Sequence, residues 1–159
     1  MPDDGKRYEL IRGAIVMTPR PIPVHQMVIH QLHNRLEAVC PADHMVLAEV
    51  DYDLPSGERV APDLIVVPRS GIGPKRVSGA ALLVVEILSP GSRRIDRVLK
   101  RTALAEAGVP AYWIIDPATH HVLALRLVEG SYDVYADTDR QVSLDWPLPV
   151  SFSVAELAR

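Results

Sequence analysis

The chain of 159 residues has the length of one ordinary domain, and its composition, 48% hydrophobic and 23% charged, is typical of a globular protein. This composition excludes disordered, collagen-like and disulfide-scaffold classes, and a single cysteine, Cys40, excludes an internal disulfide and a Cys-rich zinc site. The formal net charge of −3 excludes a uniformly basic nucleic-acid-binding protein, although a local basic face remains compatible with it.

Short elements separated by prolines are predicted for the first half of the chain. A strand over residues 14–17 precedes a helix over residues 24–39, where apolar side chains recur at helical spacing. Strict alternation of apolar and polar residues over 46–54 predicts a half-buried strand. After a turn at 55–58, a second strand is expected over residues 63–67, and the two strands should form a hairpin.

The second half contains the most apolar segments. The run over residues 81–88 predicts a central strand covered on both faces. A helix is expected over 93–107, because Gly108 and Pro110 follow in the order typical of a helix end. A buried strand (112–115), a hairpin (121–128 with 132–136) and a short closing helix after Trp146 complete an α/β domain, with a mixed sheet and helices on its faces.

Two carboxylates occupy positions where a charge is costly. Glu86 lies inside the apolar run, and an ionised carboxylate there needs a cation or hydrogen-bond donors. Its alternative role is that of a strand-end residue which reaches solvent or pairs with an arginine. Asp63 follows Pro62 at the start of the preceding strand, where an aspartate also commonly caps a turn.

The pair is more informative than either residue. If the two strands are neighbours, Asp63 and Glu86 converge at one end of the sheet, where their mutual repulsion would raise one pKa unless a divalent cation lay between them. Oxygen ligands on a rigid frame suit Mg²⁺ or Mn²⁺.

Basic residues are concentrated around this predicted site. Residues 69–101 contain eight lysines and arginines against two acidic residues, Glu86 and Asp96. A phosphate backbone is a natural ligand for such a segment, and an ordinary solvated helix and loop is the alternative. Asp96 and Lys100 are also four residues apart, the spacing of a favourable helical ion pair. The eight basic residues are Arg69, Lys75, Arg76, Arg93, Arg94, Arg97, Lys100 and Arg101.

Several short motifs occur in a recognisable order along the chain. They are residues 8–13 (YELIRG), 62–67 (PDLIVV), 85–90 (VEILSP), 93–96 (RRID), Lys100 and 107–113 (AGVPAYW). In this order they resemble the Uma-type family of restriction endonucleases, within the PD-(D/E)XK nuclease superfamily. The similarity extends over nearly the whole chain, and the ordered set is more specific than any one motif.

The resemblance implies a restriction-endonuclease-like fold, a mixed sheet flanked by helices, in one nuclease-like domain over residues 1–159. It also implies a divalent-metal site at Asp63 and Glu86, with the backbone carbonyl of Ile87 as a further ligand. Auxiliary roles are implied for Glu9 and His25, which match positions near the family site, and for Asp96.

One position departs from the superfamily pattern. The lysine expected two residues after the glutamate is replaced by Leu88, which can neither orient nor deprotonate water. In the Uma-type pattern Lys100, on the following helix, fits as the substitute. Catalysis would then use Asp63, Glu86 and Lys100.

The leading hypothesis is an endonuclease that hydrolyses DNA phosphodiester bonds with Mg²⁺ or Mn²⁺. Arg93, Arg94 and Arg97 would contact the DNA backbone without distinguishing sequence. The alternative is a catalytically degenerate nuclease-fold binding or assembly module, which Leu88 and the negative net charge favour. A hydrolase of small phosphoesters is a third reading.

The length of the apolar segments and the number of active sites per chain lead to expectations about location and assembly. No apolar run approaches the ~20 residues that span a bilayer, and residues 1–7 lack the apolar core of a signal peptide, so we expect a cytoplasmic protein without membrane contact. One active site per chain would need a second copy to cut both DNA strands. We therefore expect a homodimer, with the apolar hairpin over residues 121–136 as a candidate interface.

Overall fold

The computed structural model describes residues 7–18, 22–89 and 95–159. Its largest sheet has six strands, all antiparallel to their neighbours except the parallel pair β7 and β8. The strand order is β10 (Ser131–Thr138), β9 (His121–Val128), β8 (Ala111–Asp116), β7 (Leu83–Ile87), β6 (Leu64–Pro68) and β3 (His44–Ala48).

Two smaller sheets accompany it. The first, called the small sheet below, has the order β2 (Ala14–Thr18), β1 (Arg7–Ile11), β5 (Arg59–Val60) and β4 (Tyr52–Asp53). The second is a hairpin of β11 (Val142–Leu144) and β12 (Val150–Phe152).

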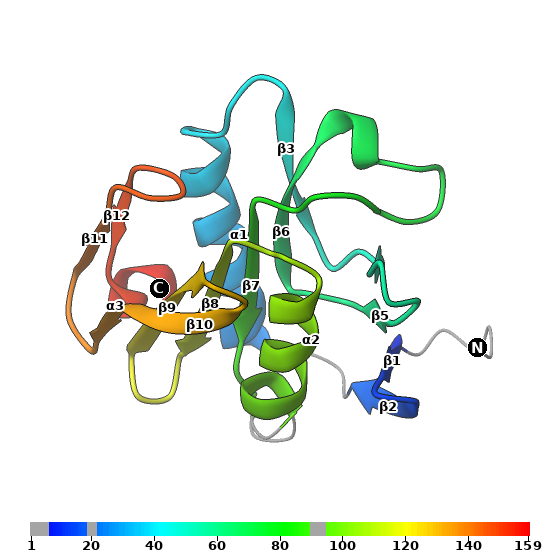
Figure 1. Ribbon diagram of the computed structural model, residues 1–159. Helices are drawn as coiled ribbons and strands as arrows, with labels where there is room; N and C mark the ends of the chain where they lie inside the picture. Colours follow the sequence, from blue (N-terminus) through cyan, green and yellow to red (C-terminus); the bar gives the residue numbers. More distant parts are fainter. Residues whose placement is uncertain (1–6, 19–21, 90–94) are drawn as a thin grey trace.

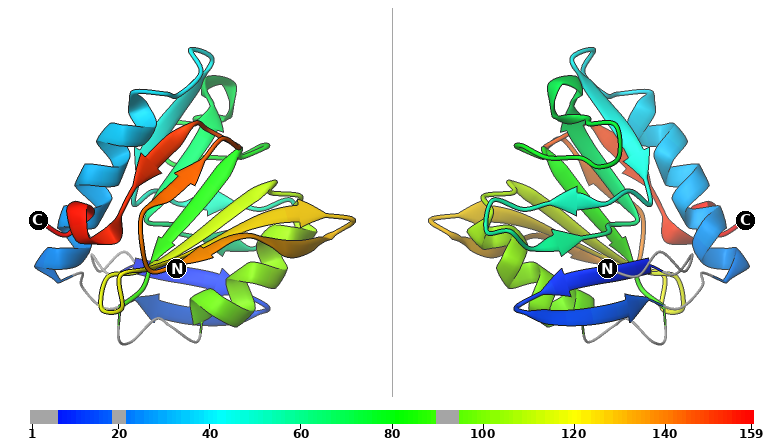
Figure 2. Two further views of the ribbon diagram at one scale, coloured as in Figure 1. Left: turned by 90° about the vertical axis from the view of Figure 1, so that its left-hand side faces the viewer. Right: turned by 90° about the vertical axis from the view of Figure 1, so that its right-hand side faces the viewer.

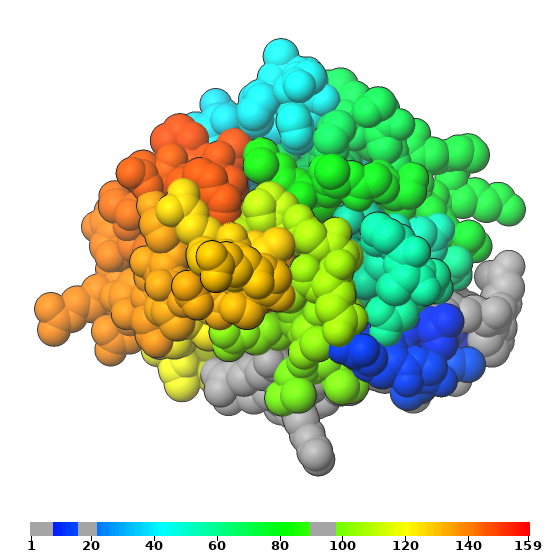
Figure 3. Space-filling model, in the orientation of Figure 1, coloured from blue at the N-terminus to red at the C-terminus, as the bar shows by residue number. Residues whose placement is uncertain are grey.

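Helices cover both faces of the six-stranded sheet. Helix α1 (Pro23–Glu37) and the short helix α3 (Val154–Leu157) lie on one face, whereas α2 (Arg101–Glu106) and the small sheet lie on the other (Figures 1 and 2). Helix α2 continues directly from a π-helical segment, Ile95–Lys100. In the space-filling view α2 lies between the β9–β10 hairpin and the small sheet (Figure 3).

The alternation of side chains along β7 divides the interior into two cores. Leu83, Val85 and Ile87 pack in the core beneath α1, whereas Val84 packs in the core beneath α2. The prediction of a central strand covered on both faces is therefore confirmed. By the same alternation, Glu86 is directed to the α2 side of the sheet.

The predicted single strand over residues 46–54 is wrong. The strand β3 ends at Ala48, Glu49 adopts a left-handed φ of 53°, and the chain then crosses to the small sheet at Tyr52. The apolar pattern continues beyond the end of β3 because two different cores bury its side chains. Val46 packs in the core beneath α1, and Tyr52 packs in the core beneath α2. The expected pairing of this strand with the next is confirmed, since β3 and β6 are antiparallel with Val46 opposite Val66.

Other differences lie near the chain ends. The strand β1 and the β11–β12 hairpin were not predicted, although the closing helix exists as α3, with a capping box between Ser153 and Glu156. The predicted stop of the second helix is confirmed, because Gly108 has φ 76° and the Val109 N–H donates to the Leu104 carbonyl. Among the described residues, no helix is long and apolar enough to cross a membrane.

Candidate active site

The register of β6 and β7 determines where the two predicted carboxylates meet. These strands are antiparallel, with Leu64 opposite Val85, so Asp63 lies beside the end of β7 that carries Glu86. The Ile87 N–H donates to Asp63 Oδ2 at 2.7 Å. Asp63 and Glu86 are 5% and 3% exposed. The structure therefore brings both buried carboxylates to one end of the sheet, as the sequence predicts.

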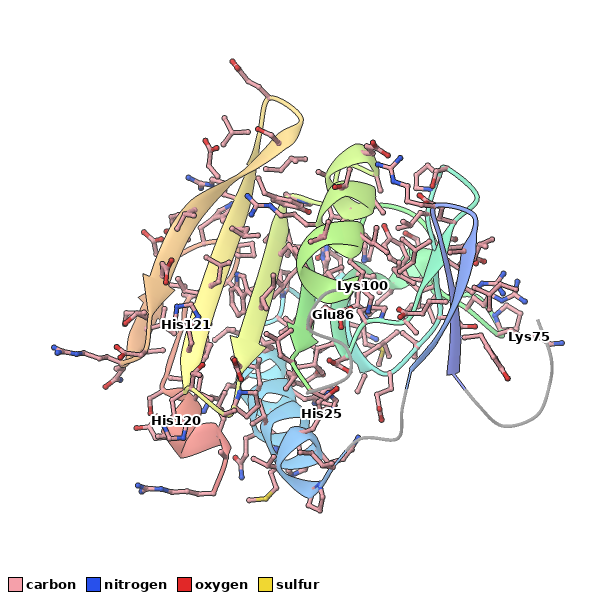
Figure 4. All side chains as sticks on the ribbon, turned by 90° about the horizontal axis from the view of Figure 1, so that it is seen from below. His25, Lys75, Glu86, Lys100, His120 and His121 are labelled. Carbon is pink, nitrogen blue, oxygen red and sulfur yellow. The ribbon has the colours of Figure 1, made fainter. Side chains whose placement is uncertain are left out.

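Lys100 reaches this end from the helical segment above the sheet. Its Nζ lies 2.6 Å from Glu86 Oε1 and 3.0 Å from Glu9 Oε1, and the lysine is 3% exposed. Figure 4 shows the labelled Lys100 and Glu86 next to each other. A buried ammonium group requires such partners, because desolvation disfavours an unpaired charge. The side chain of Lys100 is thus held at the carboxylate pair, although it comes 14 residues after Glu86.

Glu9 brings the small sheet into the site. It lies on β1 and is 2% exposed, and its Oε1 accepts a hydrogen bond of 2.6 Å from the Ala61 N–H. The side chain of Ala61 carries no chemistry, so the role of its backbone donor could not be found from residue types. Three separate elements, β1, β7 and the Ile95–Lys100 segment, thereby meet at one ammonium group.

His25 approaches Asp63 from helix α1. Its Nε2 lies 3.2 Å from Asp63 Oδ2, and the histidine is 6% exposed. Burial by itself raises the pKa of the Asp63 carboxyl. The hydrogen bond and charge of His25, the charge of Lys100 and the Ile87 N–H outweigh burial, so the pKa of Asp63 lies below its usual value.

The charged side chains of the site suit a divalent cation for which the protein supplies only some of the ligands. Three buried carboxylates face one ammonium group and one imidazole, which leaves an excess of negative charge even when His25 is protonated. Among the described residues, no three His, Cys, Asp or Glu side chains form a ready metal cage. Mg²⁺ is commonly bound by one or two carboxylates, with water and substrate phosphate completing its shell. Asp63 and Glu86 fit that mode.

The expectation that the basic segment surrounds the site is wrong for most of its described residues. Lys75 lies far from Lys100 (Figure 4), and Arg76 lies 3.7 Å from Asp53 of the small sheet. Arg101 donates to the Tyr132 carbonyl instead of facing solvent at the site. Local charge density does not reveal the direction of a side chain. Arg93 and Arg94, and the side chains of Asp96 and Arg97, lie outside the described residues.

Comparison with known proteins gave one family and one similar structure of note. The sequence profile of the Uma2 family, described as "Putative restriction endonuclease", matches residues 1–157. The fold is similar to that of a protein from Anabaena variabilis ATCC 29413, described as a putative nuclease belonging to DUF820, with a TM-score of 0.75 and 20% identity over 99% of this chain and 93% of that chain. No curated protein matches the chain significantly. The structural likeness confirms the α/β, restriction-endonuclease-like fold.

Proposed function

The chain belongs to the Uma2 family, and from this membership we propose that it is a metal-dependent endonuclease that hydrolyses DNA phosphodiester bonds. The observation that carries the proposal is the position of Lys100, whose Nζ lies 2.6 Å from Glu86 Oε1 in a buried site. Because Leu88 occupies the usual lysine position, a nuclease of this type needs its lysine from elsewhere.

Asp63 and Glu86 hold Mg²⁺ or Mn²⁺ in this proposal, with the Ile87 carbonyl as a further ligand. When bound, the metal polarises the phosphate and lowers the pKa of a coordinated water. Asp63 suits this role because its depressed pKa keeps it ionised at neutral pH. His25 and the Ile87 N–H orient its carboxylate.

Lys100 orients the attacking water and stabilises the negative charge that grows on the phosphate oxygens. An ammonium group suits both tasks, because it donates hydrogen bonds in several directions and carries a compact charge. Arg93, Arg94 and Arg97 contact neighbouring phosphates and fix the position of the DNA. The position of Lys100 supports an active enzyme over the degenerate binding module that Leu88 alone would favour.

Cleavage of supercoiled plasmid DNA in the presence of Mg²⁺ or Mn²⁺ tests the proposal. We expect Asp63→Asn, Glu86→Gln and Lys100→Met each to lower the initial rate of cleavage by about 100-fold or more. Chelation of the metal by EDTA should abolish cleavage by the wild-type protein.

Matched variants at exposed positions control for charge. Asp133→Asn, Glu37→Gln and Lys75→Met make the same chemical changes outside the site, and each should cleave at the wild-type rate. If the wild-type protein binds Mn²⁺ through Asp63 yet leaves the plasmid intact, the endonuclease proposal is wrong and the protein is a binding module. Full activity in Lys100→Met would remove the displaced lysine from the mechanism.

A further inference from the structure

We infer that Glu9 is a positioning residue that holds Lys100 against Glu86, and that it is not a ligand of the metal. The inference deepens the proposed function and rests on it for the role of Lys100. Its basis is one oxygen atom, Glu9 Oε1, which accepts from the Ala61 N–H at 2.6 Å and lies 3.0 Å from Lys100 Nζ.

The origin of Lys100 explains why it needs a second anchor. A lysine two residues after the glutamate would share the rigid strand that carries the glutamate. Lys100 instead comes from the segment that precedes α2 and spans the distance to the site with a long, flexible side chain. Glu86 alone constrains its ammonium group from one direction. Glu9, on a different sheet, constrains the ammonium group from a second direction and so fixes its position.

The surroundings of Glu9 differ from those of the proposed ligands. Asp63 and Glu86 belong to adjacent strands of the six-stranded sheet, whereas Glu9 belongs to β1 of the small sheet. Its Oε1 accepts a hydrogen bond from a backbone amide and lies against the Lys100 ammonium group at the same time, so the amide fixes the oxygen that faces the lysine. Glu9 therefore acts on the carboxylate pair through Lys100.

The reactivity of the Lys100 amine tests this without any cleavage assay. The chain contains three lysines, Lys6, Lys75 and Lys100, so acylation by an amine-reactive acetyl ester is easily resolved by peptide mass spectrometry. Lys75 is exposed and serves as the internal reference. In Glu9→Gln, we expect the acylation rate of Lys100 relative to Lys75 to increase by about tenfold over the wild type, because the ammonium group loses a charged anchor.

The matched control is Glu58→Gln. Glu58 lies beside the small sheet and accepts hydrogen bonds from the Arg12 N–H and Ser56, outside the site. Its substitution should leave the relative acylation rate of Lys100 unchanged. An equal increase in Glu58→Gln and Glu9→Gln would assign the effect to general loosening of the small sheet and overturn the inference.

Mn²⁺ titration by calorimetry separates positioning from ligation. We expect Glu9→Gln to retain the wild-type Mn²⁺ affinity within about twofold, and Asp63→Asn to lose at least about tenfold. Equal losses in both variants would make Glu9 a ligand and refute the inference. Wild-type protein that binds no Mn²⁺ would count against the proposed function, while the acylation result would still decide the role of Glu9.

A double variant covers the case in which Glu9→Gln does not fold. Glu9→Gln combined with Lys100→Met removes both partners of the ion pair and leaves no ammonium group to hold. Recovery of the folded protein, measured by circular dichroism, would show that Glu9 acts through Lys100. Continued failure to fold would give Glu9 a purely structural role and overturn the inference.

Discussion

At the residue scale, the site is a set of charges that tolerate burial only because they meet one another. Glu86 could be identified from the sequence because a carboxylate in an apolar strand demands a partner. Its partner, Lys100, was suggested by the resemblance, and only the fold shows the contact, since a separation of 14 residues gives no distance by itself. Glu9 and His25 were suggested by resemblance alone, and the structure supplies their physical contacts, the Lys100 ammonium group and the Asp63 carboxylate.

Replacement of His25 should lower the stability of the protein at neutral pH and flatten the part of its pH dependence that Asp63 contributes. The pKa of Asp63 is lower in the folded protein than its unfolded value of about 3.9, so its stabilising contribution is present above that pH and is lost as the pH falls. His25→Asn removes a hydrogen bond and a charge that oppose burial, which raises the pKa of Asp63. The contribution of Asp63 at neutral pH then shrinks, and less of it is left to be lost as the pH falls. The free energy of unfolding of His25→Asn should be lower than that of the wild type by about 3 kcal/mol at neutral pH, and the two proteins should converge at acid pH.

Urea denaturation across a pH series measures this effect. His30→Asn, at an exposed position on the same helix, should keep the wild-type stability within about 0.5 kcal/mol. Identical pH profiles for His25→Asn and the wild type would show that His25 does not determine the ionisation of Asp63.

At the element scale, sequence periodicity located the core strands but did not show in which of the two cores their side chains pack. The apolar run around Glu86 became the central strand β7, and Gly108 ended the second helix as predicted. The alternation over residues 46–54 misled because it records only that a side chain is buried. It does not record whether the burial is in the core beneath α1 or in the one beneath α2, and that choice depends on the tertiary fold.

Helix α2 continues directly from the segment that presents Lys100, and its anchorage can be tested. Leu104 is fully buried in the core on the α2 side of the sheet. We expect Leu104→Ala to lower the free energy of unfolding by about 3 kcal/mol, because it leaves a cavity beneath the helix. The exposed neighbour Thr102→Ala should change it by less than about 0.5 kcal/mol. Chemical denaturation provides the measurement, and equal stability of the two variants would contradict the assigned packing of α2.

At the scale of the whole molecule, only part of the hairpin suggested as the homodimer interface is available to a second copy. Val128 and Val134 are 40% and 59% exposed. Val122 and Leu125 of the β9–β10 hairpin are fully buried in the two cores, so they are not available to a second copy. Hydrophobic content in the sequence had suggested an interface, and the structure assigns these side chains to the interior.

The dimer itself stays a prediction that follows from the proposed chemistry. One site per chain cuts one strand at a time, so coordinated cutting of both strands needs two copies. Light scattering coupled to size exclusion should give twice the mass of the chain at micromolar concentration. The mass of a single chain, together with accumulation of nicked rather than linear plasmid, would make the protein a monomeric nicking enzyme.

The parallel pair β7 and β8 has an evolutionary consequence. Parallel neighbours require a crossover connection, and here the crossover carries Lys100 back across the face of the sheet. Insertions and deletions are tolerated in such connections far better than in a strand. The number of residues between the glutamate and the lysine is therefore free to drift during divergence, provided that the ammonium group returns to the same place. A search for distant relatives with a fixed-spacing motif would lose such proteins, whereas a search on the spatial positions of the carboxylates and the ammonium group would retain them.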